Sequence, residues 1–154
     1  MTHGLTLTLP IKQDDKTLAA LADLKANFQS LQPTIKAAMA KSKLIHFARV
    51  DVIDDKYIQV ITEYEGPHEE YIEFFRRELT AIFAAIFALA DVPPDVVQDP
   101  DKFRDYTRGR QVRSLGVAED GSLGLDGQPS GWLFSAYDFR TVAEIQAALQ
   151  AKAA

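Results

Sequence analysis

The chain of 154 residues contains no cysteine, only three histidines and a single tryptophan. Without cysteine it forms no disulfide, has no thiolate nucleophile and offers no sulfur ligand to a metal, so its stability has to come from packing. This absence is consistent with a reducing compartment, and we expect a cytoplasmic protein. The histidines, His3, His46 and His68, have no spacing typical of a three-ligand metal centre, so we predict no metal site.

Positive charge and long apolar runs are also scarce. Lysine and arginine number 17 against 22 aspartates and glutamates, a net charge of −5, which is the wrong sign for a protein that wraps nucleic acid. The longest apolar run, Leu79–Ala90, is shorter than the roughly 20 residues that span a bilayer. The first residues lead directly into an alternating pattern, so we expect no secretion signal. We therefore predict neither nucleic acid nor a membrane as a partner.

What the chain does contain is a large apolar fraction, 47%, enough for the core of one compact domain over residues 1–154. Residues 5–9 alternate between leucine and threonine, which predicts a strand with one buried face. Apolar residues three or four apart between Leu18 and Leu31 predict a one-sided helix capped by Asp14 or Asp15. Pro33 interrupts this pattern, so residues 34–40 form either a further short helix or a kinked continuation.

The middle of the chain predicts a hairpin followed by a long helix. Residues 44–53 and 57–64 are expected as strands around an Asp54–Asp55 turn, and Gly66–Pro67 opens a helix that Pro93 stops. An irregular insertion of about residues 93–130 follows, with a short helix over 101–107 and a loop or small hairpin. Residues 132–137 are expected as the last strand, and Thr141 with Glu144 forms the capping box of a C-terminal helix.

This order predicts an α+β fold, a ferredoxin-like βαββαβ sandwich with an insertion before the last strand and an extra C-terminal helix. In such a fold the helices cover only one face of the sheet. Ile45, Phe47, Tyr57 and Ile61 would then leave an exposed apolar patch on the other face. We expect a second copy of the chain to cover it, in a homodimer.

Four short motifs carry a resemblance to a known superfamily: His46-Phe47-Ala48-Arg49, Tyr64-Glu65-Gly66, Tyr71-Ile72-Glu73-Phe74 and the closing Phe134-Ser135-Ala136-Tyr137. Here the chain resembles the dimeric α+β barrel superfamily, and within it an uncharacterised bacterial group with a His-Phe-x-Arg strand motif. Glu65 stands where that group carries aspartate. The resemblance implies two ferredoxin-like units with their open sheet faces packed together. Relatives include cofactor-free monooxygenases and haem-dependent peroxidase-like enzymes.

The turn decides which side chains share a face. A two-residue turn places His46 opposite Glu63, whereas a three-residue turn places Phe47 opposite Glu63 and Arg49 opposite Ile61. The second register separates an apolar face from a mixed one more cleanly. The candidate ligand-binding residues on or beside this mixed face are His46, Arg49, Asp51, Tyr57, Gln59 and Glu63.

Each candidate also has a purely structural interpretation. Arg49 would hold an anionic or carbonyl-bearing ligand and Glu63 would move a proton, or the two would simply neutralise one another at a dimer interface. His46 would be a general base or haem ligand, or a hydrogen-bonded core histidine.

The leading functional hypothesis is a homodimer that binds a small, partly apolar molecule in a cavity between sheet and helices. It needs no cofactor, and whether the chain is an enzyme stays open. The alternative is a cofactor-free monooxygenase or a haem-dependent peroxidase-like enzyme, and a third is a purely structural interaction module.

Overall fold

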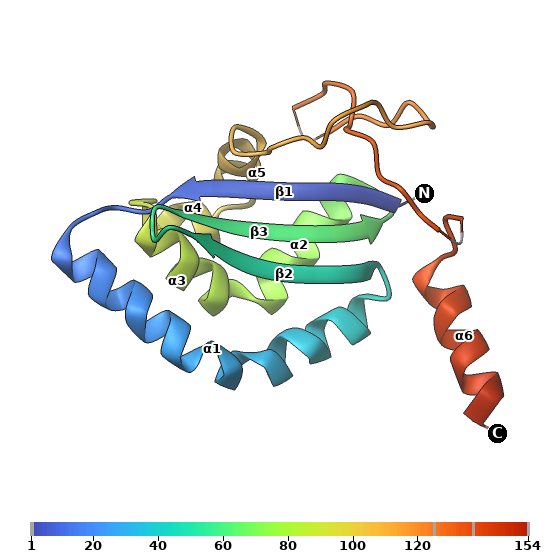
Figure 1. The fold of residues 1–154 in the computed structure, drawn as a ribbon, viewed down its shortest axis with the longest axis horizontal. Coiled ribbons are helices and arrows are strands. Elements are labelled where there is room, and N and C mark those ends of the chain that lie inside the picture. Colours follow the sequence, from blue (N-terminus) through green and yellow to red (C-terminus); the bar gives the residue numbers. More distant parts are fainter. Residues whose placement is uncertain (1, 125, 137, 154) are drawn as a thin grey trace.

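A computed structural model describes residues 2–124, 126–136 and 138–153 of the chain. It is an α+β arrangement in which one face of a three-stranded antiparallel sheet packs against helices (Figure 1). The elements are β1 (Thr2–Pro10), α1 (Asp15–Ser42), β2 (Ile45–Ile53), β3 (Tyr57–Glu65), α2 (His68–Glu78), α3 (Thr80–Leu89), α4 (Pro94–Gln98), α5 (Pro100–Arg108) and α6 (Val142–Ala153). None of these helices is both long and apolar enough to span a membrane.

Alternation along the strands determines which face is buried. The sheet has the order β1-β3-β2, and its helix face carries Leu5, Leu7 and Leu9 of β1 with Ile58, Val60 and Tyr64 of β3. Each of these side chains is at most 8% exposed. Because neighbours along a strand point to opposite faces, the residues between them form a second, open face that the helices do not cover.

The hairpin between β2 and β3 has the three-residue turn. Ile53 pairs with Tyr57, Arg49 with Ile61 and Phe47 with Glu63, as the second predicted register requires. Asp54 and Asp55 adopt left-handed backbone conformations, with φ of 50° and 54°. Aspartate tolerates this region better than most residues, which explains why these two form the turn.

The register shifts by one residue at His46. Ile45 pairs with Tyr64 while Phe47 pairs with Glu63, so His46 is the extra residue of a β-bulge. Ile45 is therefore 5% exposed on the helix face, and its predicted place in the open apolar patch is wrong. The bulge also brings His46 to the open face next to Phe47.

Two helices begin or end at other places than their sequence patterns indicate. α1 begins at the Asp14 cap, where Thr17 N donates to Asp14 Oδ1 at 2.9 Å, and it continues through Pro33 as one helix. Figure 1 shows it bending midway, as expected where proline removes a hydrogen bond. The single helix predicted after Pro67 is instead broken at Leu79 into α2 and α3. Beside the break, Thr80 Oγ1 donates to the backbone oxygen of Arg76 at 2.6 Å.

The strand predicted over residues 132–137 does not form in residues 132–136, and Tyr137 lies outside the described residues. The free edge of β1 is occupied instead by residues 110–112, through Thr8 N to Arg110 O at 3.0 Å and Val112 N to Thr6 O at 2.7 Å. Trp132 N bonds to Leu115 O at 3.2 Å, within the insertion. The edge of β1 is thus occupied by the segment directly after α5. Trp132, further along the chain, bonds to the insertion instead.

The short helix predicted over residues 101–107 and the predicted C-terminal capping box are confirmed. Asp99 caps α5 by accepting bonds from the backbone of Asp101 and Lys102, and Gly109 follows the helix. Thr141 and Glu144 form the capping box of α6, with Thr141 N donating to Glu144 Oε2 at 2.8 Å and Glu144 N donating to Thr141 Oγ1 at 3.1 Å. α6 lies at the margin of the molecule, beyond the end of the sheet (Figure 1).

Candidate functional site

The open face of the sheet carries a mixture of aromatic, aliphatic and charged side chains. Phe47 is 62% exposed, Tyr57 46% and Ile53 43%, so large apolar groups lie on it in contact with solvent. Charged and polar side chains alternate with them along β2 and β3. Such a face is typical of a surface that binds a ligand or another protein.

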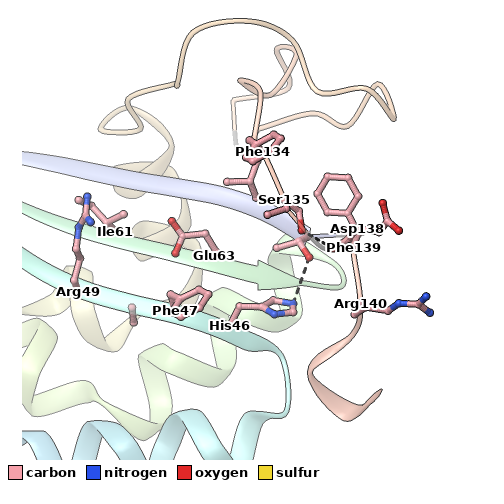
Figure 2. A pocket seen from close by; sticks show the side chains of 14 residues that line it. His46, Phe47, Arg49, Ile61, Glu63, Phe134, Ser135, Asp138, Phe139 and Arg140 are labelled. Carbon is pink, nitrogen blue, oxygen red and sulfur yellow. Dashed lines mark hydrogen bonds between the residues drawn. The ribbon is translucent and has the colours of Figure 1, made fainter. Parts of the chain in front are cut away.

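One end of this face is closed by the chain segment that leads into α6. Between the sheet and this segment lies a cavity of about 520 Å³, called here the open-face cavity (Figure 2). The sheet contributes Thr2, His46, Phe47, Ala48, Arg49, Ile61 and Glu63, and the segment contributes Leu133, Phe134, Ser135, Ala136, Asp138, Phe139 and Arg140.

Three of the six predicted site residues, His46, Arg49 and Glu63, line this cavity. The other three lie elsewhere. Asp51 forms an ion pair with Arg49, with 3.0 Å between Oδ2 and Nε, and both side chains are exposed. Gln59 donates to Thr8 Oγ1 at 2.9 Å, and Tyr57 lies at the far end of β3. Arg49 is therefore paired along its own strand rather than directly with Glu63.

Glu63 has the electrostatic setting of a group that exchanges protons. Partial burial raises the pKa of its carboxyl group, and the positive charge of Arg49 opposes that rise. Within the part of the chain that the structure describes, the Glu63 carboxylate has no ion pair. A carboxyl group in this state can donate a hydrogen bond to a ligand when protonated and accept one when charged.

His46 belongs to a buried polar contact. Its Nε2 lies 3.3 Å from Thr2 Oγ1 and 3.7 Å from Glu65 Oε1, and its side chain is only 8% exposed. An axial haem ligand needs a ring nitrogen that faces an open space. In this arrangement Nε2 of His46 faces these two groups, so this nitrogen does not fit the role of a haem ligand.

Sequence reasoning missed the contribution of residues 133–136 and 138–140 to this cavity. Phe134 and Phe139 bring two rings to its wall, and Phe134 is 68% exposed. Phe134 falls within the core strand predicted over residues 132–137, whereas Phe139 lies after that strand. The sequence offers no signal for this role, because the exposure of Phe134 and the lack of strand pairing over residues 132–136 are properties of the fold.

A second cavity lies on the other side of the sheet. This sheet–helix cavity of about 640 Å³ separates β2 and β3 from α1, α2 and α3. Its apolar lining consists of Phe28, Ile35, Met39, Ala40, Ile45, Ala48, Val50, Val60, Phe75, Leu79, Ile82, Phe83 and Ile86. Ala48 and Arg49, on β2, line both cavities.

The wall of the sheet–helix cavity contains one buried polar pair. Tyr71 Oη and Thr62 Oγ1 lie 2.7 Å apart in a hydrogen bond. Burial raises the pKa of the Tyr71 hydroxyl far above its usual value, with the bond to Thr62 opposing the rise, so the phenol is neutral. A ligand there therefore meets hydrocarbon, aromatic rings and this pair, and Gln32 and Gln146 also line the cavity.

A separate polar cluster, outside both cavities, joins β1, α2 and the insertion. The His3 and His68 rings are 5.3 Å apart, and both Nδ1 atoms are buried without a hydrogen-bond partner in the structure. His68 Nε2 lies 2.6 Å from Leu123 O. Burial lowers the pKa of His3, and the charge of His68 lowers it further while Asp120 raises it. Among the described residues, no group of three or more His, Asp or Glu is placed to hold a metal ion.

Both cavities lie beside β2, and they differ in chemistry. The open-face cavity is lined by two carboxyl groups, two guanidinium groups and aromatic rings, whereas the sheet–helix cavity is lined mainly by hydrocarbon. Comparison with known proteins found no matching family model, no matching curated protein and no matching solved structure.

Proposed function

We propose that this chain is a binding protein for a small, partly apolar molecule, which it holds in the sheet–helix cavity. The observation that supports the proposal is a space of about 640 Å³ lined mainly by apolar side chains, next to one polar pair. Well-packed protein interiors leave few voids larger than a water molecule, whereas ligand sites commonly measure about 300–1,000 Å³.

The proposed assembly is a cytoplasmic homodimer of ferredoxin-like units. Its support is the open face, where Phe47, Ile53 and Tyr57 are exposed on a sheet covered by helices on the other side only. The strand order β1-β3-β2 is consistent with a ferredoxin-like sheet, with residues 110–112 at the edge where its fourth strand would pair. A second copy packed on this face would bury these side chains. Light scattering on a gel-filtration column tests the assembly, and a stable monomer at micromolar concentration would contradict it.

A neutral fluorescent probe tests the binding site. N-phenyl-1-naphthylamine brightens in apolar surroundings, so we expect its fluorescence to rise with the protein and to saturate. Ile35→Trp fills the cavity from α1 and should abolish the signal. Leu115→Trp is the control, because Leu115 is 94% exposed in the insertion. Probe binding that survives Ile35→Trp would place the binding site elsewhere.

The open-face cavity supports a second candidate from another class, a cofactor-free enzyme. The specific observation is Glu63, a half-buried carboxyl group of raised pKa that faces a cavity also lined by Arg49. Arg49 would hold a carbonyl or phenolate oxygen while Glu63 accepts a proton. Oxygen uptake with electron-rich phenols, abolished by Glu63→Gln, would support an oxygenase. An activity unaffected by this substitution would remove Glu63 from the chemistry.

If a dimer fills both cavities with its own side chains, the third hypothesis, a structural module, is favoured.

A further inference from the structure

The charged residues of the sheet–helix cavity are all of one sign. Among the described residues that line it, Lys36 and Arg49 are charged, and none is an aspartate or glutamate. Both basic residues are exposed, whereas most of the apolar lining is buried. Arg49 pairs with Asp51 on the open face, so it is Lys36 that places positive charge at the mouth of this cavity. This distribution is unexpected in a chain with a net charge of −5.

Two other lysines of α1 form ion pairs, whereas Lys36 and Lys16 form none with the described residues. On α1, Lys25 pairs with Asp55 and Lys41 pairs with Glu78. Lys36 has no ion pair with any residue that the structure describes. Arg49, by contrast, has Asp51 beside it. The ammonium group of Lys36 is thus free to meet an anion at the mouth.

The interior offers little to a second polar group. Thr62 and Tyr71 use one of their two hydroxyl hydrogens on each other, so they leave one donor for a neutral polar group of a ligand and no cation to balance a buried charge. Each methylene group moved from water into such a cavity contributes favourably, whereas a charge moved there without a partner is strongly disfavoured. A suitable ligand is therefore apolar over its length and charged at one end only.

Resting on the proposed function, we infer that the ligand is an amphipathic anion, a hydrocarbon chain or ring system with a carboxylate at one end. The hydrocarbon lies between the sheet and α1–α3. The carboxylate stays at the mouth, in reach of water and of the Lys36 ammonium group. A carboxylate at the mouth keeps much of its hydration and so avoids the cost of burying a charge. It also gains the attraction of the unpaired Lys36 ammonium group.

The test compares an acid with an alcohol of equal chain length. Octanoate and 1-octanol each compete with N-phenyl-1-naphthylamine for the intact protein, and octanoate should displace the probe at lower concentration. Lys36→Met should weaken octanoate about threefold to tenfold and leave 1-octanol unchanged, as loss of one exposed charge contact implies. Lys36→Arg should restore the preference for the acid. Lys16→Met is the matched control, since Lys16 is exposed on α1 and does not line the cavity.

The outcomes separate this inference from the proposed function. If 1-octanol competes as well as octanoate, or if Lys36→Met leaves the preference unchanged, the anionic ligand class is overturned while apolar binding stands. If neither the probe nor either competitor binds, the proposed function itself fails. A preference for octanoate that falls as salt increases, and falls with Lys36→Met alone, supports the inference.

Discussion

Glu65 accepts a hydrogen bond from the backbone N–H of Val142 at 2.5 Å, across 77 positions of the chain. The contact joins the end of β3 to the first residue of α6, whose N–H has no partner within the helix. His46 Nε2 lies 3.7 Å from the same carboxylate oxygen. One side chain thus fixes α6 to the sheet beside the open-face cavity.

Glu65→Ala should loosen α6 without unfolding the domain. Losing one charged acceptor at a helix N-terminus costs about 1 kcal/mol, and most of that loss should be local. We expect faster amide hydrogen exchange in residues 142–152, with β1 and β3 unchanged. Glu70→Ala is a control at an exposed position. Equal exchange in both variants would show that Glu65 does not hold the helix.

Tyr71→Phe should destabilise the protein by about 1–2 kcal/mol, because it leaves the buried Thr62 hydroxyl without its partner. Thr62→Val in the same chain should recover part of this loss, since no polar group is then left unpaired. Urea unfolding of the two single variants and the double variant measures the coupling between them. Additive losses would indicate that the bond contributes nothing of its own.

Stability should fall as the pH is lowered through the range of His3. Its pKa in the folded protein is lowered below 6.5 by burial, so the unfolded chain binds more protons between these two values. The contribution of neutral His3 to the free energy of unfolding is complete above about pH 6.5. It is lost as the pH falls towards the pKa of His3 in the folded protein. The groups facing His3 are His68 from α2 and Asp120 from the insertion. Thermal unfolding from pH 5 to 8 should show a weaker slope for His3→Phe, and an unchanged slope would contradict this assignment.

Glu63→Gln should stabilise the protein at neutral pH. Burial raises the pKa of Glu63, so the folded state disfavours the charged form, and stability is lost as the pH rises through the folded pKa. The gain should vanish below about pH 4.5, where the native carboxyl group is neutral as well. Glu73→Gln provides a control of opposite sign, because Arg76 lowers the pKa of Glu73 and removing this pairing destabilises the neutral-pH protein. If urea unfolding at neutral pH shows that both substitutions stabilise the protein or that both destabilise it, the assignment for Glu63 is contradicted.

Features that depend on neighbouring residues were predictable from the sequence. Alternation in β1 and β3 predicted the buried face, the separation of apolar from mixed side chains favoured the three-residue turn, and the capping box predicted where α6 begins. These patterns are local, because a few adjacent residues determine the backbone geometry and the direction of each side chain.

The tertiary structure alone decided the features that depend on competition between distant segments. Residues 110–112 occupy the edge of β1 that residues 132–137 were expected to take, and a single extra residue at His46 moves Ile45 to the helix face. Which ion pair Arg49 forms, and whether α1 closes over the sheet or leaves a cavity, depend on packing across the whole domain. Such choices are small differences between long-range contacts, and periodicity along the chain does not encode them.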